Sequence, residues 1–107
     1  MKAWEIWTWD FEFGAHPVVI VSHPLRIANK PVVNVLKCSS QRALRPPKSH
    51  ETVLDESDGL QWETLCACDL LYAVPKAELR EPRGAVGPAR RRDIVQKIIQ
   101  ACGWNSL

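Results

Sequence analysis

The feature that most constrains this chain is a set of short apolar runs rich in β-branched residues, each bounded by turn residues. The residues from Pro17 to Ser22 read PVVIVS, and VVNVLKC spans 32–38. Stiff β-branched side chains in runs of this length favour buried strands over helices. We expect Pro17 to begin its strand, because proline cannot donate to a β-ladder.

Other segments extend this pattern on both sides. WEIWTWDF at 4–11 alternates as a strand does, and ETVLD at 51–55 predicts another strand. A DG turn at 58–59 leads into LQWETLCACDLL, a stretch long enough to bend around a barrel. YAVPKAEL at 72–79 predicts a short strand ended by a turn at its proline, and REPRGAVG at 80–87 predicts a connector.

The pattern changes to helical spacing near the C-terminus. Pro88 suits the first turn of a helix and Gly103 suits its C-terminal cap, while five apolar side chains recur between them at Ile94, Val95, Ile98, Ile99 and Cys102. Three arginines at 90–92 oppose the helix dipole in the first turn, so they form either a solvated basic surface or a contact to a partner or phosphate. The chain is expected to form one domain, 1–107, that is mostly β, a small antiparallel barrel with a C-terminal α-helix.

Composition narrows the function classes. With 107 residues, 46% hydrophobic and 24% charged, the chain suits one globular core, and its net charge of +2 indicates no broad nucleic-acid field. No signal peptide or apolar run of about 18 residues is present, so we expect a cytoplasmic protein that does not span a membrane. The four cysteines are expected to be reduced and mainly structural, without a metal site, because the C-x-C of Cys66 and Cys68 lacks zinc-ligand spacing.

Polar side chains that could act in catalysis or phosphate binding lie at three main places in the chain. His16, held extended before Pro17, is a candidate general acid or base at the mouth of a strand, while His23 and His50 are weaker candidates. The segment KCSSQRALRPPKSHE at 37–51 presents a hydroxyl and two cations that could bind phosphate: Ser39, Arg42 and Arg45. Asp69 follows LCAC in an apolar strand, so we expect it to have a hydrogen-bond partner, with either a structural or a catalytic role.

The motifs taken together resemble the MazF/PemK (Kid) family of toxins from type II toxin–antitoxin systems, from Glu5 to about Ile99. EIWTWDF is similar to the family's G-E/D-I-W-x-V-D strand, HPVVIVS to its R-P-V/A-V-I-V-S strand, and CSSQ to its I/V-T-S-Q segment. VLDESDGL and ACDLLYAVPKAEL follow where the family has V-x-L-D and x-x-D-Q-I-R-T-V-D-K-x-R-L.

The resemblance implies an SH3-like barrel with a C-terminal helix, usually a homodimer whose interface groove holds single-stranded RNA and is filled by a cognate antitoxin. It implies an endoribonuclease that needs no metal or other cofactor, in which a ribose 2′-OH attacks the adjacent phosphate. By position, Ser39 matches the active-site threonine of the family and Asp69 its proton-transferring acid, and His16 is assigned the acid–base role. Ser40, Gln41, Arg42 and Arg45 are the expected RNA-binding residues.

Two departures from the family keep other functions open. His16 stands where the family has an arginine, and Ala67 replaces a second arginine, so Arg42 or Arg45 is expected to compensate. The loop between the first two strands is also short, which predicts a different specificity. The alternatives are a non-enzymatic SH3-like module that binds a protein partner, and a CcdB-like gyrase inhibitor, which would need an aromatic tail where only Trp104 stands.

Overall fold

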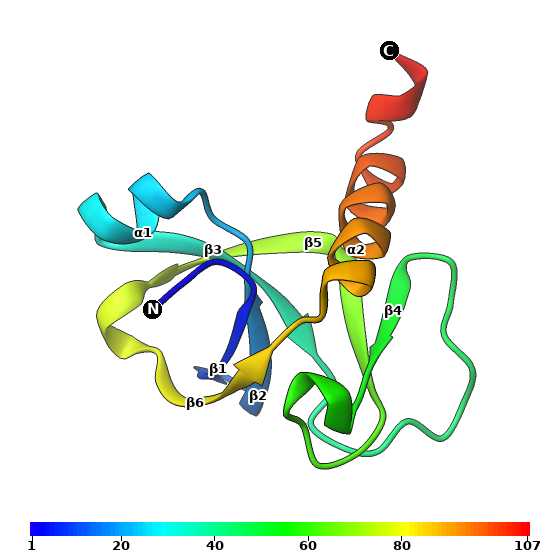
Figure 1. Ribbon diagram of the computed structural model, residues 1–107, viewed down its shortest axis with the longest axis horizontal. Coiled ribbons are helices and arrows are strands. Elements are labelled where there is room, and N and C mark those ends of the chain that lie inside the picture. Colours follow the sequence, from blue (N-terminus) through cyan, green and yellow to red (C-terminus); the bar gives the residue numbers. More distant parts are fainter.

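One six-stranded antiparallel sheet, ordered β4-β5-β3-β2-β1-β6, forms the body of the computed structural model, which describes residues 1–107. Figure 1 shows the sheet strongly curled, with α2 standing beside β4 and β5. The predicted mostly β fold with a C-terminal helix is confirmed. The elements are β1 (Glu5–Phe11), β2 (Gly14–Ile20), α1 (Pro24–Asn29), β3 (Val32–Cys38), β4 (Glu51–Leu54), η1 (Glu56–Asp58), β5 (Thr64–Pro75), η2 (Lys76–Glu78), β6 (Arg80–Ala85), α2 (Pro88–Ala101) and η3 (Trp104–Ser106).

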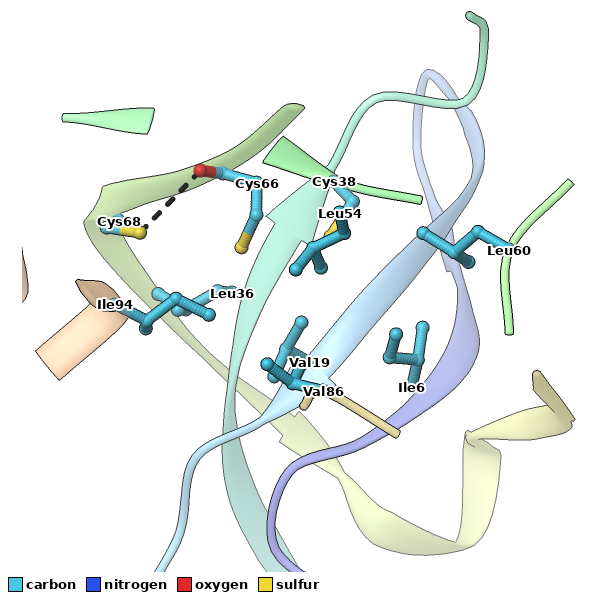
Figure 2. Packing of buried hydrophobic residues seen from close by; sticks show 10 residues of the cluster. All are labelled: Ile6, Val19, Leu36, Cys38, Leu54, Leu60, Cys66, Cys68, Val86 and Ile94. Atoms are coloured by element: carbon cyan, nitrogen blue, oxygen red, sulfur yellow. Dashed lines mark hydrogen bonds between the residues drawn. The ribbon is translucent and has the colours of Figure 1, made fainter. Parts of the chain in front are cut away.

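The central strands are buried on both faces, which explains their nearly continuous apolar sequences. On β2, Val19 belongs to a core that includes Ile94 of α2, whereas Val18 and Ile20 belong to a second core that includes Ile27 of α1. Successive side chains of a strand point to opposite faces, so the two helices cover opposite sides of the sheet. Figure 2 shows the first core, in which Ile94 and Val19 face Leu36 of β3.

The strand containing Pro17 begins earlier than predicted. β2 starts at Gly14 and ends at Ile20, and Pro17 is its fourth residue, paired with Thr8 of β1. The register with β3 begins only at Val18, so the missing N–H of Pro17 removes no bond from that side of the ladder. Proline therefore marks the point where β2 acquires its second neighbour.

Other expectations were confirmed or wrong for identifiable reasons. Strands at 32–38 and 51–54 and the helix from Pro88 to Ala101 are confirmed, and Gly103 follows that helix in the left-handed conformation, with φ of 71°. The segment predicted as a connector is instead edge strand β6, paired with β1, and α1 was not anticipated. β5 continues unbroken to Pro75 instead of forming two strands. Trp104 is 54% exposed and is not a core residue.

The two edges of the curled sheet are β4 and β6, and the helical turn η1 bridges them. After β4, η1 brings the backbone of Asp58 so close to β6 that a Cβ on Gly84 would stand 2.1 Å from the Asp58 carbonyl oxygen. The buried Asp58 carboxylate accepts from Gly87 N at 2.9 Å and pairs with Arg90 of α2. Glycine is required at this contact because any side chain would force the two segments apart.

No helix of the structure is long and apolar enough to cross a membrane. All four cysteines are free thiols. Three of them, Cys38, Cys66 and Cys68, are buried as expected, whereas Cys102 is exposed at the end of α2.

Candidate functional site

Two adjoining clefts lie where β2 begins and β3 ends. The larger, about 340 Å³, is the His16 cleft, and the smaller, about 190 Å³, is the Arg83 cleft. Ser39 and Ser40 line both clefts, so the loop after β3 forms the ridge between them. The remaining residues of the His16 cleft come from four strands and that loop: His16, Lys37, Gln41, Arg45, Glu51, Leu65 and Ala67.

The imidazole of His16 is oriented by the backbone next to Ser39. Its Nδ1 lies 2.8 Å from the carbonyl oxygen of Cys38. A carbonyl can only accept, so Nδ1 carries the hydrogen, and Nε2 of the neutral ring keeps its lone pair. This is the arrangement in which an orienting group fixes the tautomer of a general base.

Two aromatic rings pack against the imidazole of His16 and hold it in place. The rings of Phe11 and Phe13 meet it edge-on, with centroids 5.5 and 5.4 Å away. Phe13 is 64% exposed, and the ammonium of Lys37 lies 4.9 Å above its ring centroid. The partly exposed ring of Phe13 and the ammonium of Lys37 therefore lie beside the candidate base, and the cation suits the phosphates of single-stranded nucleic acid.

The hydroxyl of Ser39 makes one hydrogen bond that fixes its position and a second that a ligand could replace. Its Oγ accepts from Leu65 N at 3.0 Å, which ties the loop to β5. The hydroxyl hydrogen is donated to the carbonyl of Gln41 at 3.2 Å, in an exposed part of the loop. A phosphate oxygen entering the cleft could replace that acceptor, so the predicted phosphate contact is compatible with the geometry.

Arg45 lines the His16 cleft, but its charge is already paired with a carboxylate. Its guanidinium donates to both carboxylate oxygens of Glu51, at 2.7 and 2.9 Å, and Lys48 N donates to the same carboxylate at 2.8 Å. The hydrogen bond from Arg45 is the main reason that the pKa of the buried Glu51 falls to about 2. Arg45 is thus a poor substitute for the missing family arginines.

Replacing Glu51 by Gln should destabilise the protein by about 2 kcal/mol at pH 7, because a buried, charge-assisted bidentate pair is lost. The folded-state pKa of Glu51 is about 2, below its ordinary value of 4.5, so its contribution to stability is complete above about pH 5. That contribution is lost as pH falls toward 2. Urea unfolding at several pH values should show the two proteins converging in acid, whereas exposed Glu12→Gln should match the wild type throughout. A constant difference across pH would contradict this account.

Sequence reasoning missed Arg83 as a site residue. It lies on β6, lines the Arg83 cleft with Ser39 and Ser40, and donates from Nε to the hydroxyl of the buried Thr8 at 2.9 Å. No carboxylate pairs with it, in contrast to Arg80 on the same strand, which pairs with Asp10. Its Nη atoms are available to an anion on the serine ridge. Only the pairing of β6 with β1 brings it there, and the sequence carried no signal for that pairing.

Two predicted residues lie outside both clefts. Arg42 is exposed and makes no hydrogen bond or ion pair. Asp69 is also exposed, and the hydrogen-bond partner expected for its carboxylate is absent. The register of β5 against β3 shifts between Leu36 and Cys38, and Asp69 lies in the resulting irregular stretch. Its carboxylate is 3.8 Å from Nε2 of His50, the single polar partner it has.

No group of three or more His, Cys, Asp or Glu side chains is placed to hold a metal ion. Burial and the contact with Cys66 raise the pKa of the Cys68 thiol, with the contact as the larger cause. The buried Cys66 thiol has a raised pKa as well, first through its contact with Cys38. These thiols favour the neutral form and are packing residues beneath the cleft.

Solved structures share this fold at low sequence identity. A mycobacterial endoribonuclease, solved in complex with its cognate antitoxin, is 23% identical with a TM-score of 0.84, covering 96% of this chain and 95% of that one. The Mycobacterium tuberculosis toxin MazF-mt6 is 18% identical with a TM-score of 0.80 over 92% and 96% of the two chains. A Deinococcus radiodurans MazE–MazF structure is 14% identical, with a TM-score of 0.75 over 96% and 95%. No curated protein matches the sequence.

The curled antiparallel sheet with a C-terminal helix thus defines a chain with the fold of MazF toxins. Its sequence matches, over residues 2–102, the family described as the PemK-like, MazF-like toxin of type II toxin–antitoxin systems. The chain belongs to that family, and the predicted resemblance is confirmed.

Proposed function

We propose that this toxin is an endoribonuclease that cuts single-stranded RNA without a metal ion. Membership of the MazF-like family supports the general activity. The observation that carries the proposal is the bond from His16 Nδ1 to the Cys38 carbonyl, which leaves Nε2 free for proton transfer beside Ser39. The replacement of the family arginine by histidine is therefore compatible with acid–base catalysis in this cleft.

The proposed reaction begins with a scissile phosphate on the ridge of Ser39 and Ser40. The ribose 2′-oxygen bonds to phosphorus as His16 Nε2 takes its proton, and the bond from phosphorus to the 5′-oxygen breaks. The products are a 2′,3′-cyclic phosphate and a 5′-OH end, the leaving oxygen taking its proton from solvent water or from a second acid. The hydroxyl of Ser39 and the guanidinium of Arg83 stabilise the extra negative charge of the transition state.

The remaining predicted residues take lesser roles in this proposal. Ser40 and Gln41 line the His16 cleft together with Lys37, which was not predicted as a site residue, and all three contact the RNA around the phosphate. Arg42 attracts RNA from the exposed loop, and Arg45 positions that loop through Glu51. Asp69 is retained as the second acid–base group; it lines neither cleft of a single chain, so this role requires a rearrangement of β5 or a second copy of the protein.

The activity is tested by incubating purified protein with long single-stranded RNA in EDTA and mapping the ends of the fragments. We expect cuts at preferred sequences with 5′-OH ends. Intact RNA would overturn the proposal and favour the non-enzymatic protein-binding module, for which the replacement of two family arginines, by His16 and Ala67, is the supporting observation.

We also propose that the toxin forms a homodimer and is neutralised by a cognate antitoxin. The support is that the mycobacterial relative was solved with its cognate antitoxin and that the Deinococcus radiodurans relative is a MazE–MazF complex. Apolar side chains left exposed on β5 and α2, including Leu70, Leu71 and Val95, are compatible with a covered surface. Light scattering of the toxin alone and with its partner reads out both assemblies.

A further inference from the structure

A cavity of about 1070 Å³, larger than either cleft, takes no part in the proposed cleavage. We call it the N-terminal cavity; it lies among the N-terminal segment, α1 and η2, which Figure 1 shows together. Trp4 precedes β1 and Val21 follows β2, whereas His16 stands near the other end of β2. A strand of this length spans about 20 Å, so the cavity and the His16 cleft lie at opposite ends of the same strands.

The floor of the N-terminal cavity is apolar and preformed. Trp4, Val21 and Ile27 line it, and Trp4 and Val21 pack against the core beneath. Trp4 has a φ of 71°, a conformation that a side chain of this size rarely adopts. The backbone bonds from Trp4 N to Ile20 at 2.7 Å and from Val86 N to the Trp4 carbonyl at 2.9 Å hold it there. The indole is thus fixed before any ligand arrives.

The rim of the cavity carries cations, of which Lys76 and Arg91 form no ion pair with a carboxylate. Lys2, Lys76 and Arg91 line it, together with His23, and no Asp or Glu does. Lys76 Nζ donates to the carbonyl of Ile27 at 2.5 Å, and Arg91 Nε donates to that of Val86 at 2.7 Å, so backbone oxygens orient both side chains. The carboxylate of nearby Glu5 is used locally, by Lys2 N and the Trp7 indole.

Arg91, unlike the adjacent Arg90, forms no ion pair with a carboxylate. Arg90 and Arg91 both lie in the first turn of α2, where positive charge opposes the helix dipole. Arg90 is matched by Asp55 and Asp58. Arg91 has no acidic partner and lines the N-terminal cavity. Arg92 also forms no ion pair but does not line the N-terminal cavity, so of residues 90–92 Arg91 is the one placed to meet an anionic partner there.

We propose that the N-terminal cavity is a docking site for an acidic peptide segment of a protein partner. An apolar side chain of the peptide packs on Trp4, Val21 and Ile27, while its flanking carboxylates pair with Lys76 and Arg91. RNA fits the site less well, because nucleic-acid interfaces are more polar and more strongly basic, and stacking needs an open aromatic face. The exposed rim at Lys2, His23 and Ala28 suits a chain crossing the mouth better than an enclosed small molecule.

The test uses a fluorescein-labelled 12-residue peptide in which leucines alternate with Asp and Glu, titrated with the full-length protein at low and high salt. The location is read by NMR from the indole N–H of Trp4. Arg91→Glu should weaken binding about tenfold, whereas Arg92→Glu, the same charge change on an exposed neighbour that does not line the cavity, should change it less than about twofold. Ala28→Glu places a repelling charge on the exposed rim without disturbing the core and should act like Arg91→Glu.

Three results would overturn the proposal. The first is equal weakening by the two arginine variants, which would indicate attraction by net charge alone. The second is an unchanged Trp4 indole signal at saturation with peptide. The third is a 12-nucleotide RNA that shifts the Trp4 signal at lower concentration than the peptide does. The test measures peptide binding and leaves His16 unchanged. Its outcome therefore does not depend on whether the protein cleaves RNA.

Discussion

Replacing His16 by Ala should slow RNA cleavage by about 10³-fold, the scale expected when a positioned acid or base is removed. The Cys38 carbonyl and the two phenylalanine rings hold the imidazole, and no other histidine lines the cleft. The measurement is the single-turnover rate on end-labelled single-stranded RNA in EDTA. Induced expression should lose its growth arrest in parallel.

A histidine elsewhere in the chain provides the control. His23 is exposed and accepts from Leu25 N as the cap of α1, at the far end of β2 from the cleft. His23→Ala should cost helix-cap stability of about 1 kcal/mol but leave the cleavage rate within about twofold. The pH–rate profile of the wild type should also have a limb that His16→Ala lacks. Wild-type cleavage by His16→Ala would exclude this residue from the mechanism.

The sequence predicted the elements in which the pattern of apolar side chains matches the pattern of burial. β3 and β4 were located because their apolar residues are buried, and α2 because its helical spacing is bounded by Pro88 and Gly103. β6 escaped prediction because every one of its residues is at least partly exposed and it contains Pro82 and Gly84. Such an edge strand is specified by its partner β1, whose paired residues are more than 70 positions away in the sequence, and local periodicity does not encode such a contact.

The candidate site was predictable to a similar degree. His16 and Ser39 were found from motifs on consecutive strands, and the structure joins them through the Cys38 carbonyl. The expectation that Arg45 would compensate for the missing arginines did not anticipate its bidentate pair with Glu51, which only the fold of the loop creates. Asp69 was expected to have a hydrogen-bond partner because its neighbours are apolar, yet it lies exposed where the register of β5 shifts and has none.

Replacing Arg83 by Ala should lower kcat/KM for RNA by about 10²-fold or more, because a fixed cation beside the serine ridge would be lost in the transition state. Arg83→Lys should restore only part of the rate, since lysine lacks the planar fork that engages Thr8 and a phosphate together.

Two other arginines make this test specific. Arg80→Ala removes an equal charge from the same strand, but that charge is matched by Asp10 and should matter little to cleavage. Arg42→Ala removes an unpaired cation that lines neither cleft and should change KM more than kcat, with a weaker salt dependence of binding. If Arg42→Ala instead abolished turnover while Arg83→Ala did not, the cation that stabilises the phosphate would have to come from the exposed loop and not from β6. The pairing of β6 with β1 is therefore expected to supply, from the opposite edge of the sheet, the fixed charge that this member of the family lacks at residues 16 and 67.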